Sequence, residues 1–333
     1  MIPIFLISDE KYAPYLCTTI VSILENTART CAIYILDGGI LPDTRLQIQE
    51  TAQRYPHLHV IEFIGIDKEK FAKFPDVMHF SLNMYFRYLI PELKPELNKA
   101  LYIDSDMIVT SDIGELYDCD LHSKPLAAVP YRDERPDLAH KRSSNEHEEL
   151  GLSKDHLYFN SGLLILDCQQ FRARNWVSKL LDITEKYAKV LKYPDQDALN
   201  ILVDGNYYVL DDKWNAVVDI NLVYEVLPDT LPAVLHFTGG SNTRPWMSFS
   251  CPYREIFDAY ASSTPFAKKI YAQRIEHEIC DIKSILTKLA QAEYNRKRFP
   301  LYRLWMRLTG QRKKNQQAYN QWGKLLSRLS PPR

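Results

Sequence analysis

Short apolar runs and amphipathic stretches alternate along the first 130 residues. The apolar runs predict buried strands at residues 4–7, 32–36, 59–63 and 100–103. Helix-spaced apolar residues predict helices at 12–26, 44–54 and 82–89, with Leu46 and Ile48 facing inward on the second of them. This alternation predicts one mostly parallel, Rossmann-like central sheet with flanking helices. In such an α/β fold, ligands bind beyond the carboxyl ends of the strands.

The pattern is less regular in the second half of the chain. Further strands are predicted at 126–129, 162–166 and 234–237, and further helices at 176–192 and 195–202. The charged segment 132–149 predicts a loop, and the chain beyond residue 252 predicts helices. We therefore expect a main domain at 1–255 and a helical C-terminal region at 256–333.

The composition is that of a globular protein, since the 333 residues are 46% hydrophobic. The N-terminus lacks the basic start and long apolar run of a secretory signal, and no stretch reaches the roughly 18 apolar residues of a membrane-spanning helix. The six cysteines are scattered without a CxxC pair, so a zinc site has little support. We expect a cytoplasmic protein with reduced thiols.

Charge is distributed unevenly along the chain. Residues 291–333 hold eleven of the 41 basic residues and one of the 42 acidic residues, which leaves 1–290 with 30 basic and 41 acidic residues, a net charge of -11. Within the basic tail, about 295–333, two apolar stripes share helical spacing and lie opposite basic residues; their members are Leu301, Leu304, Trp305 and Leu308, then Trp322, Leu325, Leu326 and Leu329. The tail predicts contact with an anionic membrane, or a helix packed on the main domain or a second subunit.

Two carboxylates follow the strand predicted at 100–103. Side chains two residues apart point the same way on an extended backbone, so Asp104 and Asp106 can face one cation. Carboxylate oxygens suit Mg²⁺ or Mn²⁺, which can bridge a diphosphate and stabilise it as a leaving group. A solvated turn is the alternative, but the position directly after a buried strand favours a metal site.

A histidine and a glycine-rich turn follow another predicted strand. A strand histidine such as His236 is often only a hydrogen-bonded core residue, but Gly239 and Gly240 allow the backbone to approach a phosphate closely. An imidazole ligand would favour Mn²⁺ over Mg²⁺. Arg244, a few residues on, offers a cation for phosphate oxygens.

Three further polar segments are candidates for ligand contact. The acids of Asp-Gln-Asp at 195–197 stand where they can cap a helix, line a site, or do both. Asn160 can bind a sugar hydroxyl or shape a turn, and Asp9 can bind a nucleotide base or cap the next helix. No GxGxxG or GxxxxGK[ST] motif occurs, which argues against dinucleotide enzymes and P-loop kinases.

Together these segments resemble glycosyltransferase family 8, the retaining transferases that include bacterial lipopolysaccharide galactosyl- and glucosyltransferases and glycogenin. Six pieces match in the family's order over about residues 1–250, which is far more specific than any one piece. They are Ser8-Asp9 with Tyr12, Tyr85-Phe86-Arg87, Leu101-Tyr102-Ile103-Asp104-Ser105-Asp106, Phe159-Asn160-Ser161-Gly162, Asp195-Gln196-Asp197-Ala198-Leu199-Asn200, and His236-Phe237-Thr238-Gly239 with Pro245-Trp246. The resemblance implies a GT-A fold, a UDP-sugar donor and Mn²⁺.

The resemblance also implies roles for single residues. The metal ligands would be Asp104, Asp106 and His236. The donor-binding residues would be Ile7, Asp9, Tyr12, Arg87, Ser105, Asn160, Gly239 and Arg244. The catalytic segment would be Asp195, Gln196 and Asp197, with Gln196 beside the reacting anomeric carbon.

Two positions depart from the family's closest bacterial pattern. Arg244 stands where a Lys usually precedes the Pro-Trp pair, and Tyr131 falls near a family acceptor-side Asp, so acceptor identity does not transfer. Retention of configuration rules out a single inversion. Gln196 is a poor nucleophile and Asp197 is expected to point away, which favours attack by the acceptor on the face from which UDP departs, with the leaving phosphate taking the acceptor proton.

We therefore expect a retaining transferase that moves a hexose from UDP-galactose or UDP-glucose to a saccharide acceptor. A lipid-linked acceptor, such as a lipopolysaccharide core, would place the protein peripherally on the inner face of the cytoplasmic membrane. A protein-glycosylating transferase of the same family and a non-catalytic nucleotide-sugar or glycan-binding protein are the alternatives. The acidic main domain makes a nucleic-acid partner unexpected.

Overall fold

The computed structural model describes residues 1–74, 82–131, 149–153, 156–218 and 231–298, with side chains as far as Lys288. Most of the segment at 132–149 and the two apolar stripes of the basic tail lie outside these residues. By packing, the chain divides into a unit of residues 1–218, 227–238 and 255–267 and a unit of residues 219–226, 239–254 and 268–333. The predicted domain boundary at residue 255 stays a prediction.

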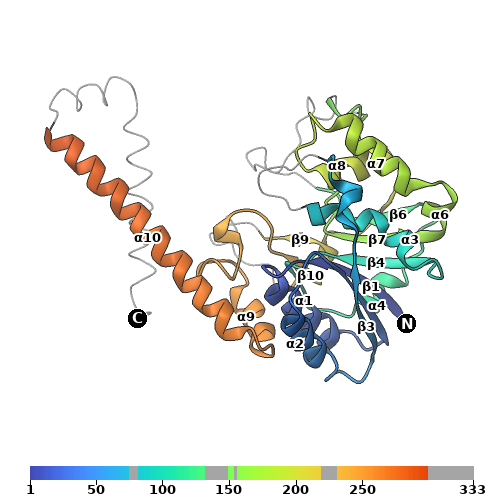
Figure 1. Ribbon diagram of the computed structural model, residues 1–333, viewed down its shortest axis with the longest axis horizontal. Coiled ribbons are helices and arrows are strands. Elements are labelled where there is room, and N and C mark those ends of the chain that lie inside the picture. Colours follow the sequence, from blue (N-terminus) through green and yellow to red (C-terminus); the bar gives the residue numbers. More distant parts are fainter. Residues whose placement is uncertain (75–81, 132–148, 154–155, 219–230, 299–333) are drawn as a thin grey trace. The chain divides into compact units, whose positions relative to one another are not determined.

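The larger unit is built on a seven-stranded sheet with strand order β3-β2-β1-β4-β7-β6-β8 (Figure 1). Its strands are β1 (Ile2–Ser8), β2 (Cys31–Asp37), β3 (Leu58–Gly65), β4 (Lys99–Ile103), β6 (Leu126–Ala128), β7 (Leu163–Asp167) and β8 (Tyr208–Val209). Only β7 pairs with its neighbours in antiparallel fashion. The prediction of a mostly parallel central sheet is confirmed.

A second, three-stranded sheet was not predicted. It has the order β5-β10-β9 and contains β5 (Met107–Val109), β9 (Ala216–Val217) and β10 (Val234–His236). β10 pairs antiparallel with β5 and parallel with β9. The strand predicted at 234–237 is present as β10, but β5 and β9 are too short to show a period-two pattern, so the local sequence does not distinguish these two strands from loops.

Helices cover both faces of the large sheet. The α-helices are α1 (Ala13–Asn26), α2 (Pro42–Ala52), α3 (Ile90–Leu93), α4 (Ile113–Tyr117), α6 (Cys168–Ala173), α7 (Trp176–Tyr187), α8 (Pro194–Val203), α9 (Arg254–Ser262) and α10 (Ala267–Arg298). The 3₁₀ helices are η1 (Lys68–Phe71), η2 (Leu82–Leu89), η3 (Asp212–Trp214) and η5 (Ser241–Thr243). The helix predicted at 82–89 is thus present as a 3₁₀ helix.

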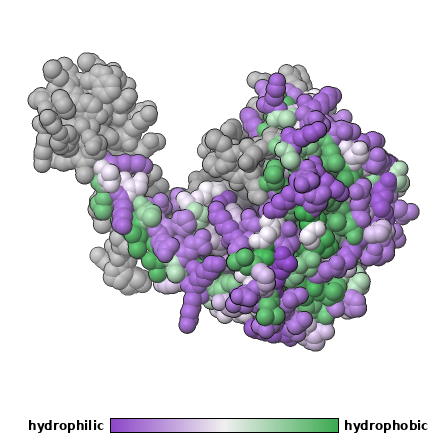
Figure 2. Space-filling view, viewed as in Figure 1, coloured by the Kyte–Doolittle hydropathy of each residue, from purple (hydrophilic) through white to green (hydrophobic). Residues whose placement is uncertain are grey.

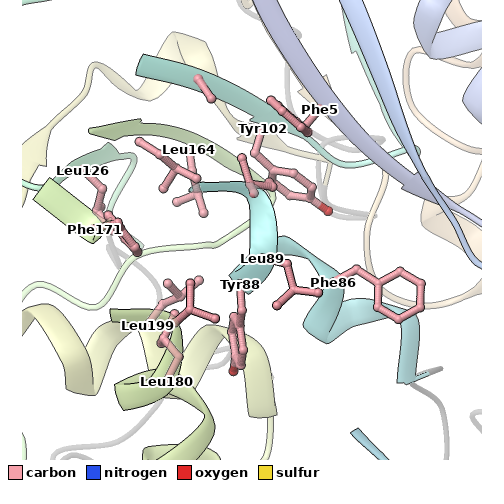
Figure 3. Packing of buried hydrophobic residues seen from close by; sticks show 14 of the residues in the cluster. Phe5, Phe86, Tyr88, Leu89, Tyr102, Leu126, Leu164, Phe171, Leu180 and Leu199 are labelled. Atoms are coloured by element: carbon pink, nitrogen blue, oxygen red, sulfur yellow. The ribbon is translucent and has the colours of Figure 1, made fainter. Parts of the chain in front are cut away.

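Alternate strand residues pack against helices on opposite faces of the sheet, because successive side chains of a strand point to opposite sides. On one face, Phe5 of β1, Tyr102 of β4 and Leu164 of β7 join Leu180 of α7 and Leu199 of α8 in one apolar cluster (Figure 3). The strand neighbours of these sheet residues are also buried, as expected for strands that are covered on both faces. This packing fixes the carboxyl ends of β1 and β4 side by side.

One inward-facing prediction is wrong. Ile48 of α2 is fully buried, but Leu46 is 54% exposed. A helix turns about 100° per residue, so side chains two positions apart lie on nearly opposite sides and cannot both face the same sheet. The other buried residues of α2 are Thr44, Thr51 and Ala52. Thr44 and Ala52 lie four residues before and after Ile48 and therefore share its side of the helix.

Within the smaller unit, α10 is bonded to the segment that precedes α9. The buried Arg274 donates from Nε to the carbonyl oxygen of Pro245. Glu278 accepts hydrogen bonds from the Ser248 hydroxyl at 3.0 Å and the Phe249 N–H at 2.9 Å. Hydrophobic and hydrophilic residues are interspersed along the helix (Figure 2), and its exposed apolar side chains are Tyr271, Ile275, Ile279 and Leu286. No helix among the described residues is both long and apolar enough to cross a membrane.

Candidate active site

The three predicted metal ligands come together at the junction of the two sheets. Asp104 follows β4, Asp106 precedes β5, and His236 ends β10. Nε2 of His236 lies 3.3 Å from Oδ1 of Asp106 and 3.9 Å from Oδ2 of Asp104. One ligand atom from each residue lies within 4.8 Å of the other two. Among the described residues, this is the one such group of His, Cys, Asp or Glu side chains.

Backbone pairing places these ligands. In the antiparallel β5–β10 ladder, Met107 is in register with His236. The N–H of Phe237 then donates to the carbonyl oxygen of Asp106 at 2.9 Å, and the N–H of Asp104 donates to the carbonyl oxygen of Gly162 at 2.8 Å. The ligands are thus held by strands that are distant in sequence.

The two oxygens of Asp104 have different surroundings. Oδ1 accepts hydrogen bonds from Arg87, at 3.0 Å from Nη2, and from the hydroxyl of Tyr102, whereas Oδ2 faces His236. Burial raises the pKa of Asp104, against the lowering effect of Arg87, and Asp106 raises it further. A cation between the carboxylates would relieve this repulsion, so the charge arrangement fits a metal site.

Arg87 connects Asp104, a predicted metal ligand, to the predicted catalytic segment. Its guanidinium is 8% exposed and lies 3.0 Å from both Asp104 and Asp195, and Nη1 also donates to the hydroxyl and carbonyl oxygens of Ser161 at 2.8 Å. Burial by itself would lower the pKa of Arg87, but the two carboxylates raise it above its usual value, so the group stays charged. Burial is also the main cause of the raised pKa of Asp195.

Gln196, in the first turn of α8, is held at both ends of its amide. Oε1 accepts from Nδ2 of Asn160 at 3.0 Å and from the N–H of Ser161 at 3.1 Å, and Nε2 donates to the hydroxyl of Tyr158 at 3.0 Å. A backbone N–H can only donate, so the contact with Ser161 settles which end of the amide is oxygen. Both lone pairs of Oε1 are therefore engaged.

Asp197, the next acid of the segment, has 0% exposure. Oδ1 accepts from the hydroxyl of Tyr158 at 2.5 Å, and Oδ2 accepts from the N–H groups of Lys192 and Tyr193 at 2.8 and 3.0 Å. These bonds cap the start of α8 and hold Tyr158 against Gln196. The position of this carboxylate relative to a reacting carbon stays a prediction.

The predicted nucleotide contacts lie at the end of β1. Oδ1 of Asp9 accepts from the N–H of Tyr12 at 3.0 Å, which is the capping role weighed as the alternative to base binding. The hydroxyl of Ser105 donates to the carbonyl oxygen of Ile7, which ties the carboxylate loop to β1. Gly239 and Arg244 belong to the smaller unit. Contact of these residues with a donor stays a prediction.

The residues present fit a divalent cation. Two carboxylates and one imidazole nitrogen converge, and a side chain at Gly162 would fill the same space, because a Cβ there would lie 2.6 Å from Cε1 of His236 and 2.8 Å from Oδ2 of Asp104. A mixed oxygen and nitrogen ligand set suits Mn²⁺ better than Mg²⁺.

The mostly parallel sheet, with the carboxylate pair after β4 and the histidine of the second sheet beside it, has the GT-A fold of the glycosyltransferase structures that align with this chain. The sequence model described as "Glycosyl transferase family 8" matches residues 3–250, and the chain belongs to this family. The resemblance found in the sequence and the GT-A fold are both confirmed.

Relatives cover most of the chain. General stress protein A of Bacillus subtilis is 32% identical over 279 residues, which are 77% of this chain and 92% of that protein. A lipopolysaccharide 1,2-glucosyltransferase of Escherichia coli is 26% identical over 252 residues, 72% of this chain and 71% of that one. The crystal structure of galactosyltransferase LgtC with donor and acceptor sugar analogues aligns with a TM-score of 0.68 and 26% identity, over 79% of this chain and 96% of that chain.

Sequence motifs do not predict the role of several residues of the site. Tyr158 links Gln196 to Asp197, and Asn215 bonds His236. The motifs show which segments have a function, but these contacts join residues that are up to about 40 positions apart, and local patterns contain no information on them.

Proposed function

We propose that this family 8 glycosyltransferase moves galactose or glucose from the corresponding UDP-sugar to a saccharide acceptor with retention of configuration. The observation that carries the proposal is the convergence of Asp104, Asp106 and His236, which Arg87 connects to Asp195. A divalent metal site next to a buried, hydrogen-bonded catalytic segment is what departure of a nucleoside diphosphate needs.

The cation is proposed to be Mn²⁺, with Mg²⁺ as a possible substitute. When bound, it supplies Lewis-acid stabilisation for the departing diphosphate. Asp104, Asp106 and His236 would hold it. Arg87 keeps Oδ1 of Asp104 occupied, so that Oδ2 is directed to the side of His236.

The hydrogen bonds around α8 favour same-face attack over a covalent intermediate. A nucleophile needs a lone pair directed at the anomeric carbon, but both lone pairs of Gln196 Oε1 accept hydrogen bonds. Both oxygens of Asp197 are likewise engaged in a side chain with no exposed surface. The acceptor would therefore attack the face from which UDP departs, and its proton would pass to the leaving phosphate.

The acceptor is proposed to be a lipid-linked saccharide at the inner face of the cytoplasmic membrane. Support comes from the lipopolysaccharide glucosyltransferase among the relatives and from the basic, apolar-striped sequence of the tail. α10 precedes this tail in the sequence and adds exposed apolar side chains, namely Ile275, Ile279 and Leu286. Full-length protein should sediment with anionic liposomes; equal sedimentation of the truncated chain 1–295 would contradict membrane contact through the tail.

The central test is incubation of the purified protein with UDP-galactose, UDP-glucose, UDP-N-acetylglucosamine and GDP-mannose, each with Mn²⁺. We expect slow release of UDP from one of the two UDP-hexoses, with the free sugar identified by mass spectrometry and its first-formed anomer by NMR. Binding without cleavage would favour the non-catalytic alternative. If no nucleotide sugar is bound or cleaved, the proposal fails. A peptide acceptor accepted in place of a glycolipid would favour protein glycosylation.

A further inference from the structure

Asn215 makes a side-chain hydrogen bond to a predicted metal ligand. It lies between η3 and β9 and is buried, with Oδ1 2.9 Å from Nδ1 of His236. Its Nδ2 donates to Oδ1 of Asn160 at 2.8 Å. Neither sequence motifs nor metal-ligand spacing draw attention to this residue.

The direction of these hydrogen bonds is fixed by two backbone groups. The N–H of Gly162 donates to Oδ1 of Asn160 at 2.9 Å, so that atom is an oxygen. At the other end of the same amide, Nδ2 of Asn160 donates to Gln196 Oε1, whose identity is fixed by the N–H of Ser161. The amide of Asn160 therefore has one orientation, and Asn215 must present its nitrogen to it.

This orientation determines the tautomer of the neutral His236 ring. Because Nδ2 of Asn215 faces Asn160, Oδ1 of Asn215 faces His236 and can only accept. The proton of the neutral imidazole is then on Nδ1, and Nε2 presents a lone pair toward Asp106, 3.3 Å away. This is the tautomer that a metal ligand requires.

We propose that Asn215 is a positioning residue that fixes the ring orientation and tautomer of His236 for metal binding, and that Asn160 connects this residue to Gln196. The inference rests on the proposed metal site. Partners of this kind orient a ligating imidazole and raise its basicity, and their loss typically lowers metal affinity by about 10- to 100-fold. Hydrogen bonds from Asn215 to Asn160 and from Asn160 to Gln196 would thus connect the metal ligand to the segment beside the reacting carbon.

The test compares two variants of Asn215 in the full-length protein. Asn215→Leu keeps the branched shape of the side chain but has no hydrogen-bonding groups, and Asn215→Asp keeps an oxygen that can accept from Nδ1 but loses the donor to Asn160. Mn²⁺ affinity is measured from the EPR signal of free Mn²⁺ during titration, on protein whose fold is checked by circular dichroism. We expect Asn215→Leu to weaken Mn²⁺ binding about 10- to 100-fold and Asn215→Asp, which keeps only the acceptor for Nδ1, to recover part of the affinity.

A matched control is Asn26→Leu. Asn26 is half-buried and donates to the carbonyl oxygens of Ser22 and Val109 and to the hydroxyl of Tyr260, so its loss also removes internal hydrogen bonds, but none involves a metal ligand. Its Mn²⁺ affinity should equal that of the wild type. An equal loss in Asn26→Leu and Asn215→Leu would mean a general effect on folding and would overturn the inference.

A second readout does not involve the metal. In metal-free protein labelled with ¹⁵N-histidine, the His236 resonances, assigned by their loss in His236→Gln, should report the Nδ1–H tautomer in the wild type and a shift toward Nε2–H in Asn215→Leu. If wild-type protein fails to bind Mn²⁺, the proposed metal site itself is wrong. If it binds Mn²⁺ and Asn215→Leu binds equally well, only the role of Asn215 is wrong.

Discussion

The N–H of Phe237 donates a hydrogen bond of 2.9 Å to the carbonyl oxygen of Asp106, so the residue that follows the predicted metal ligand His236 is bonded through its backbone to a second predicted ligand. This bond continues the pairing of β5 with β10. The proximity of Asp106 and His236 therefore depends on the backbone rather than on any attraction between their side chains. Substitution of the Asp106 side chain should leave the arrangement of the strands intact.

Asp106→Ala should abolish sugar transfer with little effect on folding. Lewis-acid stabilisation of the leaving group contributes several kcal/mol, which corresponds to a loss of at least ~100-fold in rate. Removing one of two neighbouring carboxylates also relieves their repulsion, so the melting temperature should not fall. Transfer of radiolabelled hexose is the measurement, with Asp43→Ala, an exposed carboxylate on α2, as the control. Full activity of Asp106→Ala would rule out the metal assignment.

Gly162→Ala should weaken metal binding. The added Cβ would lie 2.6 Å from Cε1 of His236 and 2.8 Å from both Oδ2 of Asp104 and Cε of Met107, so one of these groups must move. Overpacking of this kind costs about 1–3 kcal/mol. Since 1.4 kcal/mol is one factor of ten, Mn²⁺ titration should show about 5- to 150-fold weaker binding when this cost falls on the metal-bound state. In Gly65→Ala the new Cβ meets no atom within 4 Å, and binding should not change.

Arg87→Met should lower the free energy of unfolding by about 3–5 kcal/mol, because the buried carboxylate of Asp195 and the half-buried carboxylate of Asp104 would lose the buried cation they share. Arg29→Met removes an exposed ion pair with a shorter N–O distance, 2.5 Å to Asp118, and should cost less than about 1 kcal/mol. Urea unfolding of both variants measures the difference. Equal losses would mean that burial of Arg87 does not determine its contribution.

Cysteine reactivity should follow burial. Burial raises the pKa of Cys17 and of Cys168 to about 12, and the thiolate is the reactive form, so at pH 8 only about one molecule in ten thousand carries either thiolate. Cys280 is exposed on α10. Iodoacetamide at pH 8 should label Cys280 first, with Cys17 and Cys168 labelled only after unfolding in urea. Early labelling of Cys17, detected by mass spectrometry, would contradict the packing of α1.

The sequence predicts those parts of the molecule that depend on local patterns. In the large sheet, β1, β2, β4 and β7 have apolar runs of four or more residues, and Asp104 and Asp106 follow β4. Leu46 shows the limit of such reasoning, because two apolar residues on one helix need not share a face. The second sheet has strands of two or three residues, and its formation depends on pairing between segments more than 100 residues apart.

The polar network around the site is also outside the reach of a single sequence. The family resemblance identifies Asn160 and Gln196 as residues of interest, but the role of each depends on which neighbour donates and which accepts. Asn215 becomes significant only when His236, 21 residues later, is seen beside it. Motifs therefore indicate which segments form the candidate site. The direction of each hydrogen bond, and with it the tautomer of His236, is known only from the folded chain.

The late position of β10 has a consequence for synthesis on the ribosome. Chains emerge from the N-terminus at about 5–20 residues per second, and domains fold as units during synthesis. All seven strands of the large sheet end by Val209, so they can be out of the ribosome while His236 is still missing. A nascent chain with a formed central sheet would thus present two carboxylates without the imidazole, and the predicted set of metal ligands would be complete only once β10 has emerged and paired with β5.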